Sequence, residues 1–173
     1  MDDILDKVVS QQDAFKKLVS KIPGFKGYVE RGDRRMADKL LRESVSKAFE
    51  TQYQRLSSIE RDLISNGELA YVDDVEGAAI KIRQFIDRVR TAAYGYAGIF
   101  DAIKINEAEL ANVYQYDYYL LSLEETVSRA IDNVEESVGS DGLPASIKHL
   151  TKIAQAALEA FNKRTKIMQG IEK

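Results

Sequence analysis

The chain has 173 residues, of which 45% are hydrophobic and 31% are charged, and its formal net charge is -3 at pH 7. This length and balance predict one soluble folded domain, and the slightly acidic charge argues against a general attraction to nucleic acid. The absence of cysteine excludes disulfide bonds, thiolate chemistry and cysteine-based metal sites.

Residues 2–22 form the first predicted helix. Its apolar residues follow helical spacing and leave one face polar: Ile4, Leu5, Val8, Val9, Phe15, Leu18, Val19 and Ile22. Because Pro23 and Gly24 follow, we expect this amphipathic helix to end at Ile22. We predict that it packs loosely on the helical bundle of residues 23–173 or against a second subunit. Peripheral membrane contact through residues 2–22 is the alternative.

The next segment begins with a predicted loop in which Phe25 and Tyr28 are aromatic anchors. Asp33 is a suitable N-cap for the second helix, and Asn66 with Gly67 predicts its end. An earlier start of this helix, near Lys26, is the alternative. The helix carries one stripe that we expect to face the core: Ala37, Leu41, Val45, Ala48, Gln52, Leu56, Ile59 and Leu63.

The third predicted helix, capped by Asp73 or Asp74, has the most regular pattern. Its apolar residues alternate in steps of four and three, which is typical of coiled-coil-like packing: Val75, Ala79, Ile82, Ile86, Val89, Ala93, Tyr96, Phe100 and Ile103. Within it, Gly95 and Gly98 predict close packing against another backbone or a large side chain, because glycine is unfavourable in a helix interior.

Asn106 is a candidate N-cap for the fourth helix, which the run 139–142 ends, and Pro144 predicts the first turn of the fifth. No segment has the alternation of a strand. The sequence therefore predicts an all-α fold: an antiparallel helical bundle of four long helices plus the N-terminal amphipathic helix.

Tyrosines and one carboxylate gather where the third and fourth helices are joined. If these helices form an antiparallel hairpin with a turn near Ile105, Asp117 lies beside Tyr94, and Arg90 is one helical turn further. A carboxylate in an apolar seam needs hydrogen-bond donors. We predict either a structural polar network or a ligand pocket, formed by Arg90, Tyr94, Tyr96, Tyr114, Asp117 and Tyr118.

The charges are unevenly spread along the chain. Basic residues lead between Lys26 and Lys47, acidic residues dominate from Asp101 to Asp141, and the last segment is basic again. One interpretation is complementary helix faces inside one bundle. The other is a basic surface for phosphates or another protein, made of Arg31, Arg34, Arg35, Lys39 and Arg42.

The sequence contains few groups suited to catalysis. His149 is the only histidine and is expected to be solvated, and Ser146 stands where a di-iron Glu-x-x-His motif would need glutamate. We therefore predict no catalytic residues, no metal and no cofactor. Without a long apolar run or a signal-like N-terminus, we expect no transmembrane segment and a cytoplasmic protein.

Three segments carry a resemblance to a known family: residues 24–31 (GFKGYVER), 34–42 (RRMADKLLR) and 90–104 (RTAAYGYAGIFDAIK). From Pro23 to about Val134 the chain resembles an uncharacterised family of small helical prokaryotic proteins. The resemblance implies no known activity. It implies an association with band-7 (stomatin-like) or phage-shock-type membrane-stress systems.

We therefore expect a non-catalytic interaction or scaffold protein that recognises a protein partner, or a second copy of itself, through helix faces. The competing hypothesis is a small-ligand-binding bundle that uses the tyrosine and aspartate cluster.

Overall fold

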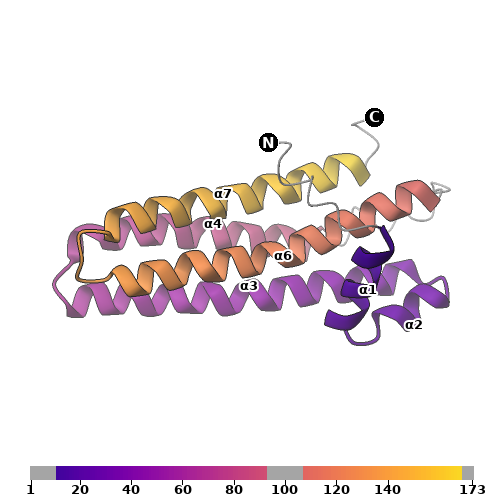
Figure 1. Ribbon diagram of the computed structural model, residues 1–173, viewed down its shortest axis with the longest axis horizontal. Helices are drawn as coiled ribbons and strands as arrows, with labels where there is room; N and C mark the ends of the chain where they lie inside the picture. The colour runs from indigo at the N-terminus through magenta and orange to yellow at the C-terminus, as the bar shows by residue number, and fades with distance from the viewer. Residues whose placement is uncertain (1–10, 93–106, 169–173) are drawn as a thin grey trace.

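The computed structural model (Figure 1) describes residues 11–92 and 107–168, and all regular structure in these ranges is helical. The long helices α3 (Arg34–Ser65), α4 (Val72–Thr91), α6 (Glu107–Ser137) and α7 (Leu143–Met168) form a bundle. Two short helices, α1 (Gln11–Lys21) and α2 (Phe25–Glu30), lie at one end of it. The predicted all-α fold is confirmed.

The bundle consists of two antiparallel hairpins, α3 with α4 and α6 with α7, whose turns lie at the same end (Figure 1). We call this end the turn end, and the opposite one, where α1 and α2 lie, the α1–α2 end. The hairpins pack side by side, so that α3 contacts the parallel α6 and α4 contacts the parallel α7. This arrangement differs from the expected hairpin of α4 with α6, because α4 forms its antiparallel hairpin with α3 and α6 forms its own with α7.

Most helix ends follow local signals in the sequence. The side chain of Asp33 accepts a hydrogen bond from the backbone N–H of Met36 and caps α3. Gly67 and Gly139 follow the ends of α3 and α6 with φ of 76° and 79°, values that glycine adopts without strain. Pro144 is the second residue of α7, where a missing N–H leaves no helical bond unmade.

Two local predictions were wrong. The N-cap of α4 is Tyr71, which follows a 3-10 turn, η2 (Leu69–Tyr71), so Asp73 and Asp74 lie in the first turn instead of capping it. Residues 25–30, in which we predicted a loop and kept a helix start near Lys26 as the alternative, form the short helix α2, which is separate from α3. Gly24 makes the sharp change of direction before α2 with φ of 83°.

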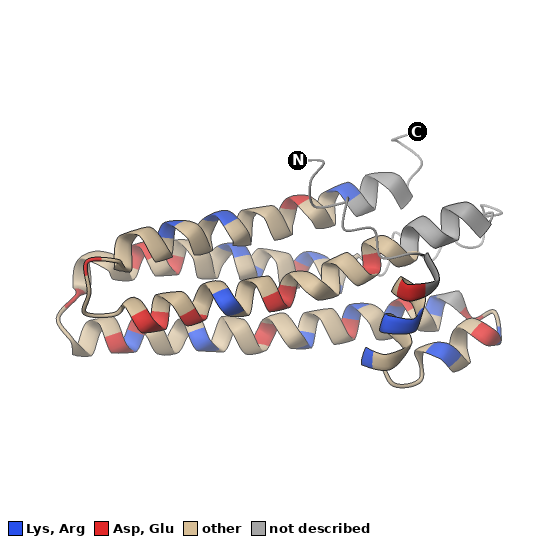
Figure 2. Cartoon of the chain, viewed as in Figure 1, with Lys and Arg blue, Asp and Glu red and all other residues tan. Residues whose placement is uncertain are grey.

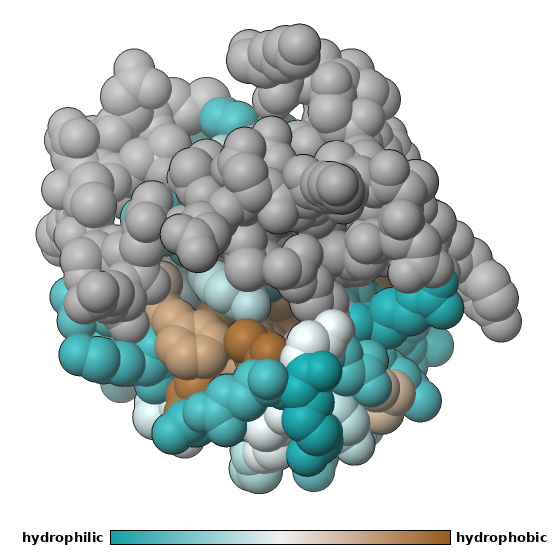
Figure 3. Space-filling model, turned by 90° about the vertical axis from the view of Figure 1, so that its right-hand side faces the viewer, coloured by the Kyte–Doolittle hydropathy of each residue, from teal (hydrophilic) through white to brown (hydrophobic). Residues whose placement is uncertain are grey.

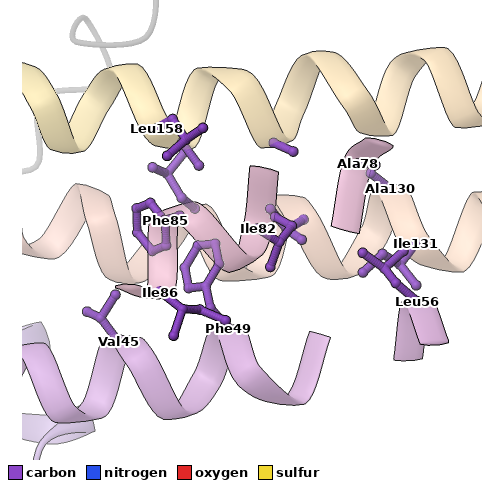
Figure 4. Packing of buried hydrophobic residues seen from close by; sticks show 14 of the residues in the cluster. Val45, Phe49, Leu56, Ala78, Ile82, Phe85, Ile86, Ala130, Ile131 and Leu158 are labelled. Carbon is purple, nitrogen blue, oxygen red and sulfur yellow. The ribbon is translucent and has the colours of Figure 1, made fainter. Parts of the chain in front are cut away.

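The core lies between the four long helices and follows the predicted stripes closely. In α4 the stripe residues Val75, Ala79, Ile82, Ile86 and Val89 are all buried. The centre of the core is aromatic (Figure 4): the ring centroids of Phe49 and Phe85 are 4.2 Å apart, and Phe161 meets Phe85 edge-on at 6.0 Å. Phe49 was missed because the predicted stripe included its neighbour Ala48, which is only half-buried.

Candidate functional site

A polar ladder joins the parallel helices α3 and α6. Gln52, which lies on the predicted apolar stripe and is only 5% exposed, donates to Glu124 Oε1 at 2.7 Å. Arg55, one turn further along α3, donates to Gln52 Oε1 and to Ser128 Oγ, each at 3.0 Å. The bonds to Glu124 and Ser128 connect residues that are 72 or 73 positions apart and so fix the register of the two helices.

Arg55 also pairs with two carboxylates of α6, Asp132 and Glu135. The hydrogen bond to Glu135 is the largest influence on the pKa of Arg55, which is raised although burial opposes the charged form. Further polar contacts join α4 to α7, where Lys81 donates to Gln155 at 2.9 Å. The two hairpins are thus held in register by polar pairs on both sides of the apolar core.

The residues of the predicted tyrosine and aspartate cluster are placed as follows. Asp117 is 4% exposed on α6, and Tyr114 and Tyr118 beside it are half-buried. Arg90 lies exposed at the end of α4 and pairs with Glu50 of α3. The remaining members, Tyr94 and Tyr96, lie outside the described residues, as do Gly95 and Gly98 with their predicted close packing.

Helix α1 packs against α6 of its own chain. It buries Ala14 and Leu18 completely. The ring of Phe15 lies 5.3 Å from that of Tyr114 and 6.1 Å from that of Phe25, so three elements meet in one aromatic cluster. The described part of the N-terminal helix is therefore docked in cis; its predicted looseness and the contribution of residues 2–10 stay predictions.

The predicted basic surface is only partly exposed. Arg42 is buried and donates to Asp38 at 2.8 Å, so it does not contribute charge to a surface. Arg31 lies over the ring of Tyr28 at 4.7 Å, while Arg35 and Lys39 are exposed.

Arg34 is the first residue of α3, and its side chain is not among those that the structure describes. The exposed lysines of α1 and α2, which the sequence analysis did not include, extend this surface. Among the described residues, the exposed basic ones of the α1–α2 end are Lys16, Lys17, Lys21, Lys26, Arg31, Arg35 and Lys39, against the exposed acids Asp13, Glu30, Asp33 and Glu43.

The turn end has the opposite charge (Figure 2). Residues 60–76 and 132–148, which form the two turns and the adjoining helix ends, contain ten acidic residues and two basic ones. Arg55 adds one further positive charge beside them. Burial and the nearby carboxylate of Glu76 raise the pKa of Glu60, as expected where acids crowd together. In the described part of the chain, the uneven charge of the sequence thus becomes a separation along the long axis of the bundle.

Apolar side chains are exposed at the same turn end. Ile64 is 54% and Leu69 is 63% exposed. A pocket of about 240 Å³ lies nearby between α3 and α6, with Ile59 and Val138 as its apolar lining and Asp62 and Glu135 among its polar groups. Ligand pockets usually measure about 300–1,000 Å³, so this one is small, and it lies at the end of the bundle opposite to Asp117.

Within the described ranges, no group of three or more histidine, aspartate or glutamate side chains is placed to hold a metal ion. No helix in these ranges is long and apolar enough to cross a membrane. Comparisons with protein-family models, curated proteins and solved structures found no match for the chain.

Proposed function

We propose that this protein is a non-catalytic interaction module that binds a protein partner through the charged ends of its helical bundle. The observation that supports the proposal is the separation of charge along the bundle axis, with acids at the turn end and exposed lysines and arginines at the α1–α2 end (Figure 2). Such a field steers and orients an oppositely charged partner.

Helix stability accounts for Asp73 and Asp74 in the first turn of α4, but not for the acids at the ends of α3 and α6. Both α3 and α6 end at the turn end, and neither has a basic residue in its last turn. Asp62 of α3 and Glu136 of α6 instead place negative charge at helix C-termini, where it opposes the helix dipole. Each such residue costs about 0.3–1 kcal/mol when exposed. Acidic residues at positions where they destabilise the helices support a role of the turn end in binding.

The basic end is tested by affinity capture from the native organism with quantitative mass spectrometry. Three exposed lysines of this end, Lys16, Lys21 and Lys39, are changed to glutamine in one bait. In a matched control bait three exposed lysines from the long sides of the bundle are changed instead: Lys47, Lys152 and Lys163. We expect an acidic protein that the wild type and the control capture and the first variant loses. Capture of the same proteins by all three baits would contradict the proposal. The resemblance in the sequence would place such a partner in a membrane-stress system.

A small-ligand site is the second candidate, and the burial of Asp117 beside Tyr114 and Tyr118 favours it. A buried carboxylate among aromatic rings suits a small organic cation. A thermal-shift screen of aromatic amines against the wild type and Asp117→Asn tests this alternative. The small-ligand site requires a compound that raises the Tm of the wild type and does not raise the Tm of Asp117→Asn.

A further inference from the structure

We infer that copies of this chain bind one another end to end, with the acidic turn end of one copy against the basic α1–α2 end of the next. This inference rests on the proposed function and names a second copy of the chain as one partner of the charged ends. It follows from three features: the charges of the two ends, the apolar residues that are exposed at the turn end and half-buried at the α1–α2 end, and the mixed charges on the long sides of the bundle.

The turn end combines negative charge with exposed apolar surface. Leu69 and Ile64 are the two most exposed large hydrophobic residues among those described, and both belong to this end. Asp62, Glu136 and Asp141 are exposed around the same turns. An apolar centre with a charged rim is the usual arrangement of a protein interface.

The α1–α2 end combines positive charge with apolar surface. Figure 3 views this end of the molecule and shows apolar residues bordered by hydrophilic ones. Val29, Met36 and Leu40 are half-buried here, beside the exposed cations. Two of these cations, Lys26 and Lys39, have exposed i,i+4 carboxylate partners at 3.6 and 3.8 Å, and such pairs hold their charges only weakly.

The long sides of the bundle offer less complementarity. They carry exposed charges of both signs, some of which pair within one chain, as in Arg83–Asp87, Arg90–Glu50 and Arg129–Glu125. Opposite charges therefore meet best when the ends face each other. Since the two surfaces differ, the contact is heterologous and leaves a free end on each copy, so it builds open chains instead of closed dimers.

The size of the ends limits the strength of this contact. At the turn end, four packed helices, each about 10–12 Å across, present a surface of roughly 400 Å². A contact that buries about 800 Å² in total lies below the roughly 1,200 Å² of a stable complex. We therefore expect weak association, in the range of tens of micromolar or above, that depends on salt because the charges are exposed.

Sedimentation velocity over a range of protein concentrations tests the inference, at about 20 mM and about 300 mM salt, where screening differs several-fold. At low salt the mean sedimentation coefficient should rise with concentration and pass the value of a dimer. At high salt it should stay near that of the monomer. A protein that remains monomeric at low salt, or that stops at two copies, would overturn the inference and leave the binding of other partners intact.

Charge reversal at each end identifies the surfaces involved. One variant carries Asp62→Lys, Glu136→Lys and Asp141→Lys, and the other carries Lys16→Glu, Lys21→Glu and Lys39→Glu. Each variant alone should stay monomeric at low salt, and an equimolar mixture should assemble again, since each reversed end then meets a complementary one. A side control with Asp87→Lys, Glu125→Lys and Glu159→Lys has the same change of net charge as the first variant and should assemble. If the mixture stays monomeric, or if the side control fails to assemble, the end-to-end contact is wrong.

Discussion

Replacing Arg55 with methionine should destabilise the bundle by about 1–3 kcal/mol. Methionine keeps most of the aliphatic length but removes the donors that connect α3 to α6. The largest loss falls on Gln52, because its amide oxygen accepts from Arg55 and its side chain is only 5% exposed, so water cannot easily replace the donor. Asp132 and Glu135 contribute little to the loss, since their side chains are 50% and 43% exposed and become hydrated.

The change is measured by urea denaturation followed by circular dichroism. Arg129→Met is a matched control, because Arg129 pairs only with its neighbour Glu125 among the described residues, and both side chains are well exposed. We expect the control to lose less than about 0.5 kcal/mol. For a chain of this size, each kcal/mol lowers Tm by about 2–4 °C. If Arg55→Met and Arg129→Met have equal midpoints, the polar ladder does not hold the two hairpins together.

Three further substitutions test separate features of the bundle. Ser46 is 2% exposed and its hydroxyl has no hydrogen-bond partner among the described residues, so Ser46→Ala should raise the free energy of unfolding by about 1 kcal/mol, while the exposed Ser58→Ala should not. Folding raises the pKa of Glu60, so its ionised form disfavours the fold: Glu60→Gln should raise Tm at pH 7 and lose this advantage near pH 3, below the ordinary pKa of 4.5. Asp117→Ala should lower the free energy of unfolding by about 2 kcal/mol, and Asp117→Asn by less; wild-type midpoints for both would mean that the carboxylate has no organised donors.

Local signals were sufficient to predict where most helices begin or end. Asp33, Gly67, Gly139 and Pro144 act within a few residues of their own positions, so their effect does not depend on the fold. The start of α4 was misplaced because Asp73 and Asp74 are equally suited to a cap and to the first turn, and η2 decides between the two.

The order of the helices around the core could not be predicted. An apolar stripe shows which side of a helix is buried, but not which neighbour covers it. We paired α4 with α6 because they follow each other in the chain, whereas α4 packs between α3 and α7. Gln52 contained the missing information: a polar residue on an apolar stripe needs a partner, and Glu124, on the helix parallel to it, supplies one.

The charges at the turn end allow binding to be separated from folding. Glu136 lies in the last turn of α6 and Asp73 in the first turn of α4, so both acids belong to the turn end but face opposite ends of a helix dipole. Glu136→Gln should therefore raise the free energy of unfolding by about 0.3–1 kcal/mol, and Asp73→Asn should lower it by a similar amount. Both substitutions should weaken salt-dependent association, because each removes one negative charge from the same surface.

Urea denaturation and sedimentation velocity on the two variants measure both effects. If the turn end is a binding surface, the two variants should change stability in opposite directions and should both weaken association. If association instead follows stability, increasing for Glu136→Gln and decreasing for Asp73→Asn, the acids act through the fold alone. The turn end would then be an ordinary solvated surface, and the separation of charge along the bundle would carry no information about a partner.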